Sequence, residues 1–382
     1  MKRMGTMILV LGLFLSAQSA LADWGAARRL TWTADASDTP AMAVDTTGSV
    51  HVAWSDYTPG NPEIYYKKSG DGGLTWGAVK RLTWTSGDSF APAIGTDSGN
   101  AVHVVWYDST PGDNEIFYRK SPDGGSTWGA AKRLTWTTGE SVFPGIAIDA
   151  GDSIHVVWSD ATPGNADVYY RQSADGGSTW GAVTRLSWTL GSSQTPALAT
   201  GPGNAVHIVW IDDTPGNPEV YYRRSGDGGA AWEAVERLIW TSGKSYSPAL
   251  VVRSSNTIYV IWEDDTPGNY ELHYRRSGDG GATWATVQRL SWTSGDSVSP
   301  TAAMDSSGAV HVVWSDYSTG NPDLYYRSRP AGSATWSATQ RLTWTPEDSA
   351  SPAMAVDGSN FIHIVWSDYT PGNYEIYYRK GS

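Results

Sequence analysis

The sequence predicts an all-β protein, a seven-bladed β-propeller with four strands in each 52-residue blade. Three observations predict this fold. The string Arg-Leu-x-Trp-Thr recurs seven times, every 52 residues, from Arg29 to Arg341. The 21 tryptophans form three sets of seven with the same spacing. Residues 23–382 show no helical periodicity, so the repeated unit consists of strands and turns.

The second unit shows the four expected strands in order. The first covers 92–97 and is rich in apolar and small residues. The second covers 101–108 and is apolar on both faces, which is typical of a strand buried on both sides. After a Thr-Pro-Gly loop comes the third strand, 115–121. A tight Gly-rich turn then leads to the fourth, 127–137, which carries the Arg-Leu-Thr-Trp-Thr string.

The two ends of the repeated region predict how the ring closes. The seventh unit stops at Ser382, after its third strand, whereas residues 23–30 have the pattern of a fourth strand with no partner before it. We therefore expect the N-terminal strand to complete the C-terminal blade. This closure would leave the ring without a free sheet edge.

Residues 1–22 have the pattern of a secretory signal peptide. A basic start, Lys2-Arg3, precedes the short apolar run 7–15 and the small-residue cleavage site Ala20-Leu21-Ala22. The run is too short to span a bilayer comfortably. We therefore expect residues 23–382 to form one secreted or periplasmic propeller domain, without insertion into a membrane.

Composition excludes several classes of protein. The chain has no cysteine, which excludes disulfides, thiolate zinc sites and thiol catalysis. With 27 basic and 39 acidic residues, its formal net charge is −12, so it lacks the basic surface of a nucleic-acid-binding protein. The many aromatic residues argue against a disordered chain.

Five units carry the turn Ser-x-Asp-x-Gly-x-Thr-Trp or a near copy. In such a turn the carboxylate accepts backbone N–H bonds and glycine adopts a positive φ. The aspartates are Asp71, Asp123, Asp175, Asp227 and Asp279. This turn resembles the Asp box, or bacterial neuraminidase repeat, of sialidase-type propellers, and the resemblance covers residues 23–382. It implies that these aspartates are structural and lie opposite the active-site face. It implies no single activity, because such propellers include sialidases, other glycosidases, receptors and assembly factors.

The resemblance also raises the question of catalysis. Sialidases of this family use an arginine triad, a tyrosine nucleophile paired with a glutamate, and an aspartate acid/base. The sequence lacks the Phe/Tyr-Arg-Ile-Pro motif, and nearly all its arginines are periodic. Arg253, Glu263 and Tyr107 break the repeat and could line one side of the axis, although drift in a duplicated array accounts for them equally well. No pair of carboxylates suited to glycoside hydrolysis is evident, so no catalytic residue is assigned.

The loop between the second and third strands is the most uniform polar feature. By the family's topology it lies on the ligand-binding face, opposite the Asp boxes. One interpretation is structural: its Asp and Asn side chains cap the turn, and its Glu or Asp bonds a neighbouring backbone or the arginine of an adjacent blade. The other is a set of shallow sugar sites, each with a tryptophan platform and polar partners. The candidate residues are Trp84, Trp136, Asp56, Asn61, Glu63, Asp108, Glu115, Asp160 and Asn165.

Metal binding is the third possibility for these residue types. The acidic residues of the loop match no EF-hand spacing. The six histidines of the second strands occur one per blade, too far apart to share one ion, so we expect them to pack between blades. No metal or cofactor is therefore predicted.

The sequence thus predicts a secreted, monomeric propeller that binds a glycan or an extracellular protein through the loop face, without catalysis. The first alternative is an exo-sialidase or related glycoside hydrolase with a divergent active site. The second is a purely structural extracellular scaffold.

Overall fold

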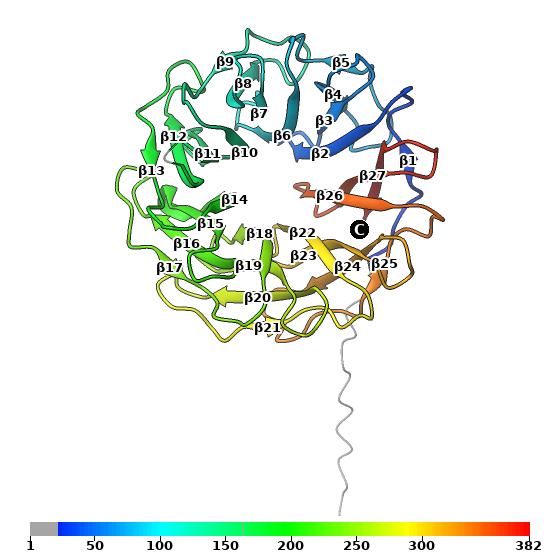
Figure 1. Cartoon of the computed structure of the whole chain (residues 1–382). Coiled ribbons are helices and arrows are strands. Elements are labelled where there is room, and N and C mark those ends of the chain that lie inside the picture. The colour runs from blue at the N-terminus through cyan, green and yellow to red at the C-terminus, as the bar shows by residue number, and fades with distance from the viewer. Residues whose placement is uncertain (1–21, 163) are drawn as a thin grey trace, which may run out of the picture.

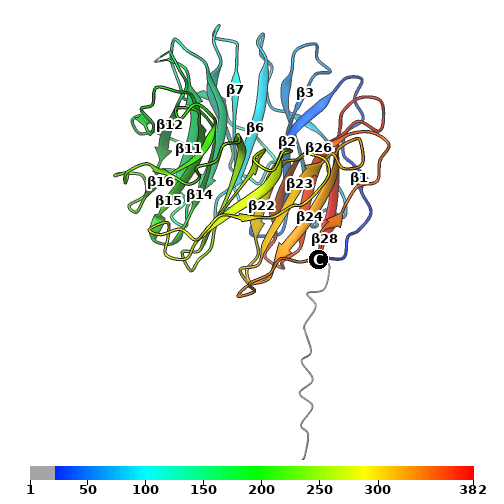
Figure 2. The same cartoon turned by 60° about the horizontal axis from the view of Figure 1, so that its bottom comes forward.

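The computed structural model describes residues 22–162 and 164–382. The expected signal peptide, 1–22, therefore lies outside the described residues except for Ala22. Seven four-stranded antiparallel sheets surround a central axis as the blades of a ring (Figure 1). The strands of each blade run along the depth of the ring (Figure 2). The predicted seven-bladed all-β fold is confirmed.

The first and second strands of the blades form the inner half of the ring. The first strands are β2 (Ser37–Val44), β6 (Ser89–Thr96), β10 (Ser141–Ile148), β14 (Ser193–Thr200), β18 (Ser245–Val252), β22 (Ser297–Met304) and β26 (Ser349–Val356). The second strands are β3 (Val50–Asp56), β7 (Val102–Asp108), β11 (Ile154–Asp160), β15 (Val206–Asp212), β19 (Ile258–Asp264), β23 (Val310–Asp316) and β27 (Ile362–Asp368).

The third and fourth strands form the outer half. The third strands are β4 (Glu63–Ser69), β8 (Glu115–Ser121), β12 (Asp167–Ser173), β16 (Glu219–Ser225), β20 (Glu271–Ser277), β24 (Asp323–Arg329) and β28 (Glu375–Gly381). The fourth strands are β5 (Lys80–Arg81), β9 (Lys132–Arg133), β13 (Thr184–Arg185), β17 (Glu236–Arg237), β21 (Gln288–Arg289), β25 (Gln340–Arg341) and β1 (Arg28–Arg29). A short 3₁₀ turn, η1 (Pro202–Asn204), precedes β15. Blade 1 is β2–β5, and blade 7 is β26–β28 with β1.

Two strands of each blade differ from the prediction. The first strand of blade 2 begins earlier, at Ser89, because the Ser89 hydroxyl donates to Asp108 on the neighbouring strand. The fourth strand has only two paired residues. Beyond them, the Ile116 N–H donates to the Thr135 hydroxyl instead of a backbone carbonyl, so a side chain ends the ladder.

The hydrophobic core lies between neighbouring blades. All residues of β3 are buried, and the second-strand tryptophans, such as Trp106, are at most 1% exposed. One cluster joins Tyr66 and Leu82 of blade 1 to Val104 and Trp106 of blade 2. Each blade therefore buries its faces only by packing against its neighbours, which favours a closed ring.

The ring closes as predicted. Strand β1 pairs with β28, with Arg29 opposite Tyr377, and Trp24 forms a bridge to Gly381. Leu30, next to β1, is 1% exposed and packs with Tyr378 in the core between blades 7 and 1. The two ends of the described chain are thus held in one sheet (Figures 1 and 2). Residues 22–162 and 164–382 contain no helix long and apolar enough to span a bilayer.

Candidate functional site

Each blade presents two different ends. In blade 1, β3 ends at Asp56 and β4 begins at Glu63, so the loop between them lies at one end of the sheet. Strand β4 then runs back to Ser69, where the Asp-box turn begins at the opposite end. We call these ends of the ring the loop face and the Asp-box face.

On the Asp-box face, each aspartate binds within its own turn. Asp71 accepts hydrogen bonds from the Ser69 hydroxyl at 2.8 Å and from the Thr75 N–H at 2.8 Å and hydroxyl at 2.5 Å. These bonds, those from Thr75 first, lower the Asp71 pKa to about 2. The exposed carboxylate is therefore ionised and occupied in holding the hairpin.

The Asp box also joins two blades. The Trp128 ring of the blade 2 turn packs edge-on against Tyr66 of blade 1, at 5.0 Å between centroids. The Tyr66 hydroxyl bonds Nδ1 of His51 at 2.7 Å, and Nε2 of this buried histidine bonds Asp45 at 3.1 Å. The histidines were expected to pack between blades. Their polar contacts lie instead within one blade, and only the tyrosine reaches the next.

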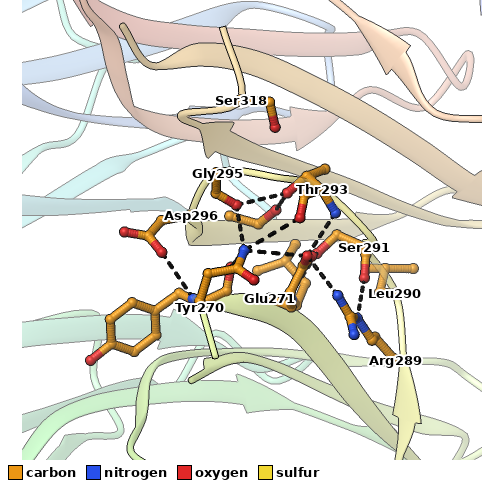
Figure 3. A network of polar contacts seen from close by, with 12 residues as sticks. Tyr270, Glu271, Arg289, Leu290, Ser291, Thr293, Gly295, Asp296 and Ser318 are labelled. Carbon is orange, nitrogen blue, oxygen red and sulfur yellow. Dashed lines mark hydrogen bonds and ion pairs between the residues drawn. The ribbon is translucent and has the colours of Figure 1, made fainter. Parts of the chain in front are cut away.

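On the loop face, the acidic candidates are buried and bonded to the protein. Glu63 accepts bonds from Arg81 at 2.7 Å and from the Thr85 N–H at 2.8 Å. Figure 3 shows the blade 5 copy, where Glu271 binds Arg289 and Thr293. The bond from the Thr85 N–H agrees with the expected backbone contact. The arginine belongs to the same blade as the glutamate, so the alternative of an arginine from an adjacent blade is wrong. The pairing is local because the third and fourth strands are neighbours in one sheet.

The remaining polar candidates hold the same loops. Asp56 is 1% exposed and accepts bonds from the Ser37 hydroxyl at 2.8 Å and the Thr58 N–H at 3.0 Å. Asn61 donates to the carbonyls of two residues in the loop after the fourth strand. The other candidates make equivalent bonds in the next two blades, namely Asp108, Glu115, Asp160 and Asn165. These side chains therefore fix the conformation of the loops and are themselves largely buried.

The tryptophans after the fourth strands are exposed, in contrast to those of the second strands. Trp84 is 65% and Trp136 66% exposed. The five equivalent residues are 61–68% exposed: Trp32, Trp188, Trp240, Trp292 and Trp344. Two cations flank the Trp84 ring, with Arg81 at 5.7 Å and Arg119 of the next blade at 5.9 Å from its centroid. Seven indole rings therefore stand around the outer edge of the loop face, each beside a gap between two blades.

Cavities lie in at least three of these gaps. The cavity beside Trp136 has a volume of about 310 Å³ and that beside Trp32 about 320 Å³. The cavity beside Trp240 is larger, about 570 Å³, and has His273 in its wall where the other two have Tyr169 and Tyr65. The smaller imidazole leaves more room than a phenol. We call each such cavity with its tryptophan an inter-blade groove.

A separate cavity of about 400 Å³ opens on the axis. It is lined by seven pairs of a residue and a following proline, one pair from each first strand, such as Ala91-Pro92. Each residue before the proline has a positive φ, 47° at Ala91, at a break in strand register. Among the described residues, this lining includes no arginine and no carboxylate. It therefore lacks the arginine triad that binds the substrate carboxylate in sialidases.

The three candidates for catalysis do not gather on one side of the axis. Tyr107 in blade 2 packs with Phe90, and Glu263 in blade 5 accepts bonds from the Ser299 N–H at 2.6 Å and the Ser247 hydroxyl at 3.2 Å. Both lie near the loop-face end of a second strand. Burial raises the Glu263 pKa.

Arg253 lies at the other end of its blade. It follows β18 at the Asp-box end and donates to the Ser307 carbonyl of blade 6 at 2.7 Å. The expectation that Arg253, Glu263 and Tyr107 line one side of the axis is therefore wrong. Their sequence positions gave no indication of the end of the strand on which each side chain lies.

One set of residues at the grooves was not predicted from the sequence. The third-strand cations, such as Arg119, were recognised only as part of the periodic arginines. Arg119 contacts the neighbouring blade, since its Nη1 donates to the Leu82 carbonyl, and it also lies over Trp84. The constant spacing of 35 residues from each groove tryptophan to the next third-strand cation, as from Trp84 to Arg119, was the available signal.

These features define a class of protein: a closed propeller with Asp-box turns on one face and aromatic grooves on the other. Residues 15–187 match a family described as BNR repeat-containing family member. This match agrees with the resemblance of the turns to the Asp box of sialidase-type propellers. Comparison with curated proteins gives no match.

Three solved structures share the fold at low sequence identity. An ulvan lyase, a polysaccharide lyase, has a TM-score of 0.63 at 11% identity and covers 92% of this chain and 95% of its own. A mutant of the NanB sialidase from Streptococcus pneumoniae has a TM-score of 0.53 at 14% identity, with coverage of 92% and 70%. A protein of unknown function from Dyadobacter fermentans has a TM-score of 0.57 at 13% identity, with coverage of 93% and 99%. At these identities the likeness concerns the fold.

Proposed function

We propose that the protein is an exported glycan-binding propeller that holds saccharides in its inter-blade grooves, without catalysis. The observation that carries this proposal is the ring of seven exposed tryptophans, each 61–68% exposed. Exposed aromatic residues gathered on one face commonly mark an interaction site, and the flat apolar face of an indole suits the C–H face of a sugar ring.

The grooves support this proposal by their size and lining. Volumes of about 310–570 Å³ lie in the range of small-ligand sites. Beside Trp136 the lining combines an aromatic platform with the polar side chains of Thr137 and Thr162. The carbohydrate-acting propellers among the similar structures are consistent with a saccharide ligand.

Repetition would add avidity. A single shallow groove is expected to bind weakly, but several grooves on one rigid ring can engage one polymer at once. Strong binding to a polysaccharide and weak binding to its short fragments is therefore expected of this arrangement. The same sites would not require a metal.

The first prediction tests the tryptophans. The double substitution Trp84→Ala and Trp136→Ala should reduce polysaccharide affinity at least about tenfold, because each loses a stacking platform that contributes roughly 1 kcal/mol or more. A glycan array identifies the polymer, and titration calorimetry measures the affinity.

Leu74→Ala is the matched control, because this leucine is 62% exposed but belongs to an Asp-box turn on the other face. Its binding should equal that of the unchanged protein. Equal affinity in the tryptophan variant would contradict the proposal.

Glycoside hydrolysis is the second candidate, favoured by one observation. Glu263 is 7% exposed near the axis, and its burial raises its pKa, as a general acid requires. If the protein hydrolyses a fluorogenic sialoside, Glu263→Gln should lower kcat at least about a hundredfold. Hydrolysis that survives this change would exclude Glu263 as the acid, and Ser247→Ala serves as a control that removes only one of its hydrogen bonds.

A further inference from the structure

Each groove tryptophan has a second cation beside it, from the third strand of the following blade. These are Lys67, Arg119, Arg171, Arg223, Arg275, Arg327 and Arg379, one in every blade. Six of them lie within 6.0 Å of the centroid of the exposed indole, while Arg275 lines the Trp240 cavity. The positive charges therefore repeat with the same period as the grooves.

The third-strand cations have no acidic partner among the described residues. Arg119 donates from Nε to the Gly129 carbonyl at 2.6 Å and from Nη1 to the Leu82 carbonyl. Arg171 repeats this pattern, and its Nη1 lies 2.5 Å from the Leu134 carbonyl. No ion pair within 4.0 Å joins any of the seven to a carboxylate in the described part of the chain, whereas Arg81 of the fourth strand pairs with Glu63 at 2.7 Å.

These uncompensated cations are unusual in a chain with a net charge of −12. They are also partly buried, and burial lowers the pKa of Lys67 and of each of the six arginines. A partly desolvated cation that meets only carbonyl dipoles is less stable than one paired with an anion. An anion bound in the groove would remove this deficit.

We propose that the ligand of the grooves is an acidic polysaccharide, whose carboxylate or sulfate groups pair with the third-strand cations while its sugar rings stack on the tryptophans. This inference rests on the proposed glycan-binding function and names the class of glycan. The guanidinium of Arg119 bonds carbonyls through Nε and Nη1, which leaves Nη2 for an anionic oxygen.

The experiment compares matched polymers that differ only in charge. Calorimetry measures binding of polygalacturonate against its carboxyl-reduced form, and of a sulfated galactan against its desulfated form. In at least one pair, the acidic member should bind about tenfold tighter. This preference should shrink as NaCl is raised from about 0.05 M to about 0.5 M, because salt screens exposed charges.

Variants locate the preference. Arg119→Gln with Arg171→Gln should reduce affinity for the acidic polymer and leave the neutral one unchanged. Arg119→Lys with Arg171→Lys should retain it, since blade 1 has Lys67 at this position. The control, Lys80→Gln with Lys132→Gln, removes the same number of positive charges from the fourth strands of blades 1 and 2, where these lysines bond carbonyls of Asp-box turns.

The outcomes separate the two proposals. If both members of every pair bind equally, and Trp84→Ala with Trp136→Ala weakens the binding of both, glycan binding stands and the acidic ligand is wrong. If no polymer binds, the glycan-binding function itself is wrong. Equal binding to polyglutamate would show general polyanion attraction and would also overturn the saccharide assignment. The polymer comparison needs only the unchanged protein, so it holds even if a variant fails to fold.

Discussion

At the scale of single residues, the contact between blades depends on close fits that tolerate no extra atom. Gly125 of the blade 2 Asp box has φ +87° and lies against the Tyr66 ring of blade 1, where a Cβ would overlap the phenol. That phenol in turn bonds His51 at 2.7 Å. A glycine at this position therefore serves both the turn and the neighbouring blade.

Gly125→Ala should lower the free energy of unfolding by about 2 kcal/mol or more, because the left-handed backbone and the overlap with Tyr66 both oppose a side chain. The denaturation midpoint measures this loss. Gly112→Ala is the matched control: its φ is +115°, but a Cβ there would meet nothing within 4 Å. If both variants lose the same stability, the backbone conformation alone is responsible and the overlap contributes nothing.

At the scale of elements, the fourth strand decides the shape of both the groove and the ring. It has only two paired residues, so the chain leaves the sheet directly after Arg81 and carries Trp84 out to the edge. In blade 7 the same element is β1, which arrives from the other end of the chain. This short strand thus precedes the exposed tryptophan in all seven blades, and in blade 7 it also closes the ring.

Removal of residues 1–33 should expose the edge of β28 and the core that Leu30 covers, which is 1% exposed in the intact ring. An unpaired edge favours pairing with another copy, so self-association and a lower denaturation midpoint are expected. Analytical ultracentrifugation measures the first and denaturant titration the second. Addition of a peptide with residues 22–33 should restore the monomer, and a truncated chain that remains monomeric and equally stable would argue against closure by β1.

At the scale of the whole molecule, repetition multiplies small effects. Six buried histidines occupy the second strands, and burial lowers the pKa of each: His51, His103, His155, His207, His311 and His363. Five of them bond an aspartate, but His207 has Gly201 at that place, and burial lowers its pKa from 6.5 to about 4. The folded ring therefore holds these imidazoles neutral.

The ring should lose stability in acid. Each histidine has a pKa of about 6.5 in the unfolded chain and a lower pKa in the folded ring. Between these two values the unfolded chain binds more protons than the folded one. The histidines' contribution to the free energy of unfolding is therefore complete above about pH 6.5 and falls as the pH decreases through this window. His207 alone accounts for at most about 3 kcal/mol once the pH is below about 4. Denaturation midpoints measured from pH 8 to pH 4 should decline, and His207→Gln should reduce the decline. A midpoint that is constant over this range would contradict the prediction.

The candidate site was only partly predictable. The exposed tryptophans and the buried loop residues each recur once in every repeat, so the sequence could name both sets. It placed Trp84 in a candidate site and Trp106 in a strand buried on both faces, but it could not show how far each indole is exposed, 65% for Trp84 and 1% for Trp106. Exposure depends on which blade packs against which, and that contact joins residues of two different repeats.

The sequence alone determined the number of blades, the order of the strands and the closure of the ring, because a constant spacing of 52 residues is a local property of the chain. Only the tertiary structure decided which groups remain available to a ligand. Glu63 forms an ion pair with Arg81 at 2.7 Å. Arg119 instead donates to backbone carbonyls, and no carboxylate among the described residues pairs with it. Such pairing is set by distances between strands and between blades, which no periodicity in the sequence expresses.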